Sequence, residues 1–179
     1  MKQEAFFKLL EKLNGIDYFF LSGLSVAIHT GGKREPQDID IAVNEKDIDK
    51  FTNLLGVSAH SRTIDKGTFQ VNDFGLETIF EGQKIEVSTG YPVKRKENNT
   101  FNKLFKLKKK ATFLGKQVFV EPIEELITQK AFMHREKDIR DLELLKDLKY
   151  DQTLLLELAE DKGNSKEIFE VLKKVGFKV

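Results

Sequence analysis

Two aspartates, Asp38 and Asp40, stand two residues apart in a run that alternates between polar and apolar side chains. In a β-strand this alternation places both carboxylates on one face, with Ile39 and Ile41 on the other. The two aspartates are then about 6–7 Å apart at their base, so their oxygens can converge on one cation. Glu86 stands in a second alternating run and becomes a third ligand if the two strands lie side by side. A ligand set made only of carboxylate oxygens favours Mg²⁺ or Mn²⁺ over zinc.

A solvated strand face is the alternative interpretation of the aspartate pair, and Asp73 and Glu77 are alternative third ligands. Three carboxylates held at about 4 Å would repel one another by roughly 4 kcal/mol per pair at an effective dielectric constant of about 20. Such a cluster makes sense if a divalent cation balances its charge. The pattern therefore predicts a metal site made by Asp38, Asp40 and Glu86.

The segment before the aspartates has the order of a phosphate-binding turn. A short apolar run over residues 16–21 predicts a buried strand, Ser22-Gly23 follow it, and residues 24–30 predict a helix. This order places backbone N–H groups and the positive end of the helix where a phosphate can bind. Gly23 permits close approach of the backbone, and the Ser25 hydroxyl can donate a hydrogen bond. A plain helix N-cap at Ser22 is an alternative that is compatible with phosphate binding.

The first half of the chain alternates between helices and strands. Helical spacing predicts a helix over residues 2–13, and strand alternation over residues 38–43 is followed by a helix from residue 44 or 45 to residue 55. Residues 56–74 give only a weak strand signal, near residues 69–71.

The second half begins with hairpins and ends with helices. Turn residues indicate two hairpins, which join residues 76–80 to 84–88 and residues 111–114 to 117–120. From residue 122 the pattern is helical, with breaks near 134–137, 150–151 and 163–164. The fold class is therefore α+β (mixed α/β), with a short mixed sheet flanked by helices and a C-terminal helical region.

These motifs together resemble the DNA-polymerase-β-like nucleotidyltransferase superfamily. The segments that carry the resemblance are residues 21–27, 34–40, 125–130 and 135–142. They are most similar to the minimal branch that includes abortive-infection and toxin–antitoxin nucleotidyltransferases, and the resemblance spans residues 16–145. It implies a nucleotidyltransferase core over residues 1–121 and a C-terminal helical region over residues 122–179.

The resemblance also implies a reaction. Asp38, Asp40 and Glu86 would hold two Mg²⁺ (or Mn²⁺), and the enzyme would move a nucleoside monophosphate from an NTP, such as ATP, to an acceptor hydroxyl. The acceptor stays open between an RNA end, such as that of a tRNA, a protein and a small molecule, and an antitoxin is a candidate partner. Arg34 either contacts phosphate or lies in a surface loop, and Lys130 either reaches the triphosphate or extends from the core edge to solvent. A catalytically degenerate RNA- or protein-binding module is the alternative function, and a metal-dependent phosphoesterase is a third.

The helical part of the resemblance also contains Asp138 and Asp141, which stand three residues apart and so share one helix face. Pairing with basic residues at the surface explains them as well as a functional role does. His29 is expected to be structural, with a place near the site because its helix starts there.

Charge is concentrated locally rather than globally. The chain has 179 residues, a formal net charge of +1 and no cysteine. Residues 94–116 are strongly basic and carry interleaved phenylalanines, which is typical either of an RNA-binding surface or of a solvated helix that packs its apolar side inward. The lack of cysteine, of a cleavable leader and of a membrane-length apolar run predicts a cytoplasmic protein with no membrane partner.

Overall fold

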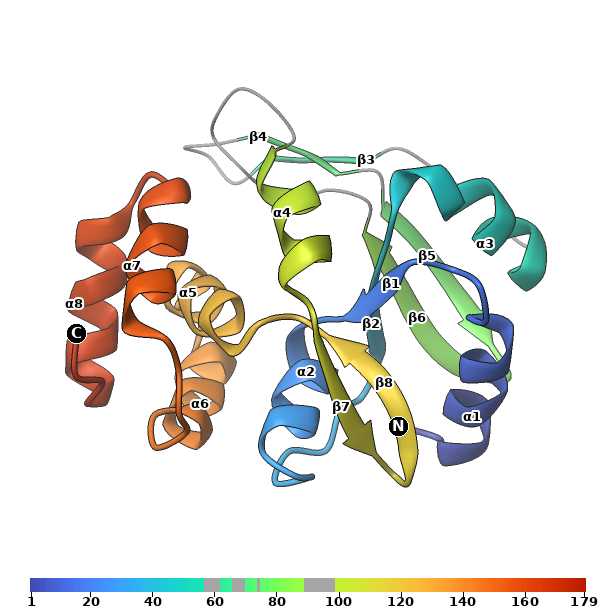
Figure 1. Ribbon diagram of the computed structural model, residues 1–179, viewed down its shortest axis with the longest axis horizontal. Coiled ribbons are helices and arrows are strands. Elements are labelled where there is room, and N and C mark those ends of the chain that lie inside the picture. The colour runs from blue at the N-terminus through green and yellow to red at the C-terminus, as the bar shows by residue number, and fades with distance from the viewer. Residues whose placement is uncertain (57–61, 66–69, 74, 89–98) are drawn as a thin grey trace.

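The computed structural model describes residues 1–56, 62–65, 70–73, 75–88 and 99–179 (Figure 1). Its centre is a six-stranded sheet with the strand order β5-β6-β2-β1-β8-β7. The strands of this sheet are β1 (Tyr18–Phe20), β2 (Ile39–Val43), β5 (Gly75–Phe80), β6 (Gln83–Ser88), β7 (Lys109–Phe113) and β8 (Lys116–Val120). β2 pairs parallel with β6 and β1 pairs parallel with β8, whereas the other neighbours are antiparallel. The predicted α+β class with a mixed sheet is confirmed.

Both predicted hairpins are present. The residues that turn β5 into β6, Glu81 and Gly82, have φ angles of 52° and 70°, and the residues that turn β7 into β8, Leu114 and Gly115, have φ angles of 49° and 74°. Two successive positive φ values are characteristic of the type I′ turn, whose twist matches that of the strands it joins. β5, β6 and β8 each begin one residue before the predicted start, and β7 begins two residues before it and ends one residue earlier than predicted.

A second, smaller sheet was largely missed by the sequence analysis. It consists of β3 (Arg62–Asp65) and β4 (Gln70–Asp73), which pair antiparallel. The weak signal near residues 69–71 overlaps β4, but nothing in the alternation indicated β3. A two-stranded sheet is stable mainly through its packing against the rest of the protein, so the sequence of each strand gives only a weak indication of it.

Helices surround the large sheet and continue beyond it. Their bounds are α1 (Gln3–Lys12), α2 (Ser22–His29), a 3₁₀ turn (Glu45–Asp47), α3 (Ile48–Leu55), α4 (Asn99–Leu107), α5 (Ile123–Met133), α6 (Glu136–Leu145), α7 (Gln152–Asp161) and α8 (Ser165–Val175). α2 begins at Ser22, two residues before the predicted start, so Ser22 and Gly23 form the first turn of the helix. Among the described residues, no helix combines the length and the apolar character that crossing a bilayer requires.

Different helices bury the two faces of the large sheet. Ile39, Ile41 and Val43 of β2 pack in one core with α1 and with Leu24 and Ile28 of α2. Ala42, on the opposite face of β2, packs in another core that α4 covers; its members are Phe19, Leu21, Ala42, Leu104, Phe105 and Leu158. Because side chains alternate along a strand, Asp40 points to the Ala42 face. The polar residues predicted for catalysis therefore lie on the face that α4 partly covers.

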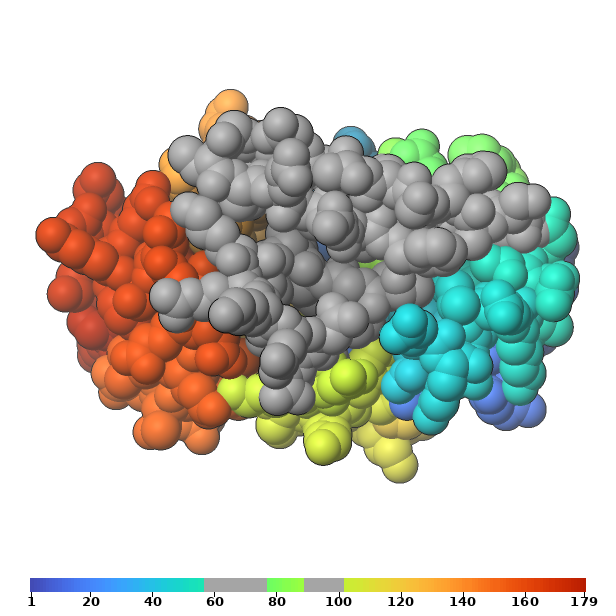
Figure 2. Space-filling view, turned by 90° about the horizontal axis from the view of Figure 1, so that it is seen from above, coloured from blue at the N-terminus to red at the C-terminus, as the bar shows by residue number. Residues whose placement is uncertain are grey.

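The C-terminal helices α5–α8 pack around a third core, to which α2 contributes Val26. Figure 2 shows these helices at one end of the molecule and α3 at the other. The shared core joins α2, which follows the first strand, to the C-terminal helices. The division into units 1–121 and 122–179 stays a prediction.

Candidate active site: three carboxylates beside a chain of ion pairs

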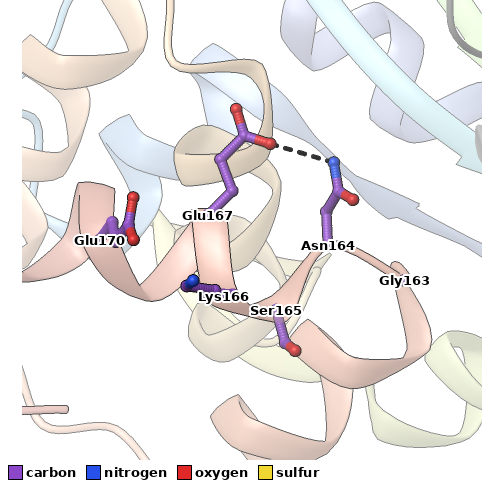
Figure 3. A pocket seen from close by; sticks show the side chains of 6 residues that line it. All are labelled: Gly163, Asn164, Ser165, Lys166, Glu167 and Glu170. Atoms are coloured by element: carbon purple, nitrogen blue, oxygen red, sulfur yellow. Dashed lines mark hydrogen bonds between the residues drawn. The ribbon is translucent and has the colours of Figure 1, made fainter.

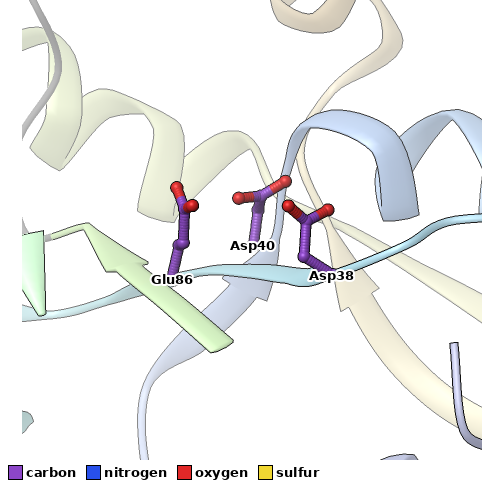
Figure 4. A group of neighbouring side chains, drawn as sticks. All are labelled: Asp38, Asp40 and Glu86. Carbon is purple, nitrogen blue, oxygen red and sulfur yellow. The ribbon is translucent and has the colours of Figure 1, made fainter. Parts of the chain in front are cut away.

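Asp38 lies immediately before β2, Asp40 lies on β2, and Glu86 lies on the neighbouring strand β6 (Figure 4). In the parallel pairing of these strands, Asp40 is the register partner of Glu86. One carboxylate oxygen from each of the three residues lies within 4.8 Å of the others. Figure 4 shows the three side chains on the same side of the two strands. The structure thus brings together the three residues predicted from strand alternation, which we name the acidic cluster.

The electrostatics of the acidic cluster centre on Asp40. The pKa of Asp40 is raised from its ordinary value of 3.8 to about 7, chiefly by burial and further by the negative charges of Asp38 and Glu86. A hydrogen bond from the Ser22 side chain and the positive charge of Lys130 act in the opposite direction. A cation between the carboxylates would favour their ionised forms. The donor set, with Asp40 and Glu86 on adjacent strands and Asp38 directly before β2, therefore fits a hard divalent cation such as Mg²⁺.

Arg34 lies against the first turn of α2. A Cβ atom built at Gly23 would lie 2.4 Å from Nη1 and 2.8 Å from Cζ of Arg34, so the guanidinium occupies the space that only glycine leaves open. Nε of Arg34 also donates a hydrogen bond of 2.6 Å to Oδ1 of Asp141, on α6. Arg34 is therefore tied down between α2 and α6 and is not a free surface residue.

Lys130 continues this connection into the C-terminal helices. Its Nζ lies 2.8 Å from Oδ2 of Asp141 and 3.2 Å from Oδ1 of Asp138, and its side chain is only 4% exposed. The interpretation in which Lys130 extends to solvent is therefore wrong. Nε of Arg135 lies 2.6 Å from Oδ2 of Asp138 and closes the series, which we name the ion-pair chain: Arg34, Asp141, Lys130, Asp138 and Arg135.

The ion-pair chain and the acidic cluster influence each other. Burial raises the pKa of Asp138, but the hydrogen bond from Arg135 and the charge of Lys130 outweigh it, so that the net shift is downward. Lys130 lowers the pKa of Asp40, and Asp40 contributes to the raised pKa of Arg135. Carboxylates and basic side chains therefore adjoin at one place, which is the charge pattern that a metal-bound polyphosphate needs.

The predicted phosphate turn differs from its expected form. Ser22 has a left-handed φ of 53°, and its N–H donates a hydrogen bond of 2.8 Å to Oε1 of Glu121. The backbone N–H of Ser22 is thus bound to a carboxylate of the protein itself. The Ser25 hydroxyl is fully buried in α2 and makes no hydrogen bond with the residues that the structure describes. His29, on the same helix, hydrogen-bonds through Nε2 with the carbonyl of Glu121, as a structural residue near the site would.

Two residues that form bonds at this site, Glu121 and Arg135, were given no individual role in the sequence analysis. Glu121 is fully buried at the end of β8, and Arg135 is the N-cap of α6. The available signals were a charged residue directly after an alternating strand, and an Arg three positions before Asp138 at a helix start. Both signals are local and common, so neither indicates which distant residue will be the partner.

Two lysines of the basic stretch form ion pairs within the protein. Lys103 on α4 pairs with Glu157 and Asp161 of α7. Lys108 pairs with Asp17 and stacks over the Phe119 ring, and Phe105 is buried in the α4 core. The apolar side of α4 therefore packs inward, as expected if this stretch is a solvated helix rather than an RNA-binding surface. Residues 94–98 lie outside the described part of the chain, as does the side chain of Asp73, an alternative third ligand.

A hollow in the surface lies away from this site, at the turn between α7 and α8. Figure 3 shows its lining, from Gly163 to Glu167 and Glu170, and the hydrogen bond of 3.1 Å that Asn164 donates to Glu167. Lys166, Glu167 and Glu170 mix both signs of charge, and no member of the acidic cluster lines it. We therefore assign the chemistry to the acidic cluster.

Comparison with solved structures identifies the fold. The chain is similar to a candidate nucleotidyltransferase from Thermotoga maritima, with a TM-score of 0.56 and 22% identity over 79% of this chain and 92% of that one. It is also similar to the lincosamide antibiotic adenylyltransferase LnuA, solved with lincomycin, with a TM-score of 0.53 and 15% identity over 83% of this chain and 99% of that one. A third similar structure is ANT(2'')-Ia with adenylyl-2''-tobramycin, with a TM-score of 0.51 and 9% identity over 97% of both chains.

These likenesses show that the chain has the nucleotidyltransferase fold. The sequence matches no protein-family model and no curated protein. The toxin–antitoxin branch stays a prediction, since the similar structures described above include two antibiotic-modifying adenylyltransferases. A shared fold does not by itself establish an activity, which depends on the residues of the site.

Proposed function

We propose that this protein is a metal-dependent nucleotidyltransferase that moves a nucleoside monophosphate from an NTP to an acceptor hydroxyl. The observation that carries the proposal is the acidic cluster, whose three carboxylates come from two adjacent strands and approach within 4.8 Å. The fold is the one found in adenylyltransferases that modify lincomycin-type and tobramycin-type acceptors. Fold alone does not establish chemistry, but a carboxylate cluster on this fold supports it.

Asp38, Asp40 and Glu86 would hold two Mg²⁺ or Mn²⁺. Divalent cations bound there supply charge neutralisation for the triphosphate and a lower pKa for the acceptor hydroxyl. The role of the protein would be to hold these carboxylates in fixed positions. The hydrogen-bonded pairing of β2 with β6 does this, because each strand limits the movement of the other. Burial and the charges of Asp38 and Glu86 raise the pKa of Asp40, so a cation bound there would stabilise its ionised form.

Basic groups of the ion-pair chain would bind the phosphates of the NTP. Arg34 is suited to this role because its planar guanidinium already lies against Gly23, at the start of α2. Among the residues that the structure describes, it forms a hydrogen bond to Asp141 through Nε alone. Lys130 is buried between Asp138 and Asp141, and its positive charge acts on Asp40, so it would add to the positive potential at the triphosphate. Ser22 and Ser25 would contribute hydroxyl groups, and Gly23 would permit close approach.

The acceptor is open between a small molecule, a protein and an RNA. The similar structures favour a small molecule, because one was solved with lincomycin and another with adenylyl-2''-tobramycin. An RNA acceptor, such as a tRNA end, would use the lysines of the basic stretch that stay exposed, which include Lys106, Lys109 and Lys110. An antitoxin partner remains a prediction from the resemblance.

Incubation with Mg²⁺ and each labelled NTP in turn, against cell extract, RNA and small-molecule fractions, tests the proposal. We expect the wild type to transfer label from at least one NTP and Asp40→Asn to transfer none. Release of free nucleotide without a labelled acceptor would indicate a phosphoesterase. RNA or protein binding with no Mg²⁺-dependent NTP binding would indicate the degenerate binding module and would refute the proposal.

A further inference from the structure

We infer that Gln83, at the start of β6, is a positioning residue for Asp38 of the acidic cluster. Its buried side-chain amide holds the peptide group that leads into Asp38, just before the backbone pairing of β2 with β6 begins. This inference rests on the proposed function, since the residue that Gln83 would position belongs to the candidate metal site.

Asp38 is the member of the acidic cluster that lies outside the strands. The pairing of β2 with β6 begins at Ile39, whose partner is Ile85, and it includes Asp40 with Glu86. The backbone pairing therefore holds Asp40 and Glu86 together directly, whereas Asp38 lies one residue before β2. The position of the Asp38 carboxylate thus depends also on the groups that hold the segment leading into the strand.

The Gln83 side chain reaches this segment from the neighbouring strand. Its Nε2 donates a hydrogen bond of 2.7 Å to the carbonyl of Gln37. That carbonyl belongs to the planar peptide group between Gln37 and Asp38, so the bond restrains the backbone at the point where Asp38 begins. Continued by two residues, the β2–β6 register would place Gln37 beside Gln83. A side-chain amide therefore joins the two segments beyond the end of the backbone pairing.

The Gln83 amide is itself held at both of its ends. Oε1 accepts a hydrogen bond of 2.9 Å from the N–H of Lys2, and Nε2 lies 3.3 Å from the carbonyl of Lys84 in addition to its bond with Gln37. Only one of the two flipped orientations of the amide places oxygen against the donor and nitrogen against the two acceptors. Gln83 is 5% exposed, so breaking these bonds leaves buried polar groups without partners, which costs free energy.

Gln83 lies on the face of β6 opposite Glu86. It shares its buried face with Ile85 and Val87, which pack in the core that α1 covers. A glutamine on such a face is costly unless its amide is hydrogen-bonded. The amide thus supports the backbone before Asp38 from the α1 side, while the carboxylates of the acidic cluster lie on the other side of the sheet. This geometry fits a residue that positions a metal ligand without binding the metal.

The test compares Gln83→Met with a matched control, Asn44→Leu. Methionine keeps the length of the side chain and removes both ends of the amide. Asn44 directly follows β2 at its other end, where its amide donates a bond of 3.1 Å to Asp17 and accepts one of 3.3 Å from the N–H of Lys46. Asn44→Leu therefore removes an amide that is also bonded at both ends, but at the end of β2 that is away from Asp38.

Mn²⁺ affinity without nucleotide, measured by electron paramagnetic resonance, is the first readout. We expect Gln83→Met to weaken Mn²⁺ binding by about tenfold, the lower end of the losses that follow removal of a supporting partner of a metal ligand. Asn44→Leu should lose thermal stability but stay within about twofold of the wild-type Mn²⁺ affinity, because distant sites act independently.

The Mg²⁺ dependence of nucleotide transfer is the second readout. The Mg²⁺ concentration that gives half-maximal transfer should rise in Gln83→Met by the same factor as the Mn²⁺ dissociation constant, and saturating Mg²⁺ should restore most of kcat. Loss of folded protein would instead lower kcat at every Mg²⁺ concentration.

An unchanged Mn²⁺ affinity in Gln83→Met, or an equal loss of affinity in Asn44→Leu, would overturn the inference. If Gln83→Met does not fold, Gln83→Ala decides. The shorter side chain leaves room for water to bond with the freed carbonyls and N–H, but water does not tie Gln37 to β6. A wild-type Mn²⁺ affinity in Gln83→Ala would then overturn the inference.

The proposed function can fail separately. A wild type that binds Mn²⁺ but transfers no nucleotide from any NTP would refute the transferase while leaving the Mn²⁺ affinities to decide the role of Gln83. A wild type that binds no Mn²⁺ would refute both.

Discussion

Asp40 on β2 and Glu86 on β6 are register partners in a parallel pair of strands. The backbone ladder therefore holds two carboxylates together against their mutual repulsion, and the same repulsion raises the pKa of Asp40 beyond the effect of burial. Sites that hold like charges together in this way commonly serve a ligand that neutralises them.

The contribution of Asp40 to stability should fall as pH rises when no metal is bound. The folded-state pKa of Asp40 is about 7, above its ordinary value of 3.8, so the folded protein binds this proton more tightly than the unfolded chain does. The free energy of unfolding therefore loses a contribution as pH rises from near 4 to near 7. Thermal melts of wild type and Asp40→Asn in EDTA across this range should show the variant gaining on wild type with increasing pH. Addition of Mg²⁺ and NTP should then stabilise wild type more than the variant. A variant that melts well below wild type at pH 7 in EDTA would make Asp40 a structural residue.

Glu86, and not its neighbour Glu77, should be the third metal ligand. The two face each other across the β5–β6 hairpin, and Lys84 pairs with both. Only Glu86 belongs to the acidic cluster. We expect Glu86→Gln to lower nucleotide transfer by about 100-fold or more, which exceeds typical losses from residues outside the ligand set. Glu77→Gln, the matched control, should stay close to wild type. If Glu77→Gln instead lowers nucleotide transfer more than Glu86→Gln does, Glu77 is the third metal ligand.

Removal of the Arg34 side chain should weaken NTP binding. A hydrogen bond to a charged group contributes about 1.5–3 kcal/mol, so Arg34→Met should raise the KM for NTP by about tenfold or more. Lys33→Met is the control, because Lys33 is an exposed neighbour. Steady-state kinetics of both variants measure the difference. If KM for NTP changes equally little in Arg34→Met and Lys33→Met, Arg34 has a structural role through Asp141 and does not bind the nucleotide.

Gly23→Ala should destabilise the protein through Arg34. The new Cβ would lie 2.4 Å from Nη1 of Arg34, and the hydrogen bond from Arg34 to Asp141 limits how far the guanidinium can retreat. Overpacking of this kind costs about 1–3 kcal/mol. Chemical denaturation should show that Gly23→Ala costs much less stability in an Arg34→Ala background than in the wild type, because the clash is then absent. Equal losses in both backgrounds would place the clash elsewhere.

Adjacent lysines of the basic stretch should behave in opposite ways. Lys108 pairs with Asp17 and lies 4.4 Å from the centroid of the Phe119 ring, whereas Lys109 and Lys110 are exposed. Lys108→Gln should therefore lower stability by about 1–2 kcal/mol, because Asp17 loses a charged partner. Lys109→Gln with Lys110→Gln should leave stability unchanged and, if RNA is the acceptor, reduce both RNA affinity and its dependence on salt. An unaltered affinity across a salt series would make these lysines ordinary surface residues.

Local pattern determined a large part of the fold and of the site. Alternation around Asp38 and Asp40 predicted which side chains share a face, and the same period predicted the strand of Glu86 and both hairpins. The structure confirms both hairpins, because a hairpin depends on residues that lie close together in the chain. The fold that the resemblance implied is confirmed as well, by similar solved structures.

Only the tertiary structure decided how the distant parts meet. The bond from Arg34 to Asp141 spans 107 residues, and that from Ser22 to Glu121 spans 99. A single residue type carries no information about a partner so far away, so the sequence left Arg34 and Lys130 open between two environments and gave Glu121 no role. The parallel pairing of β2 with β6, on which the acidic cluster depends, is likewise a choice of sheet topology that alternation within each strand does not encode.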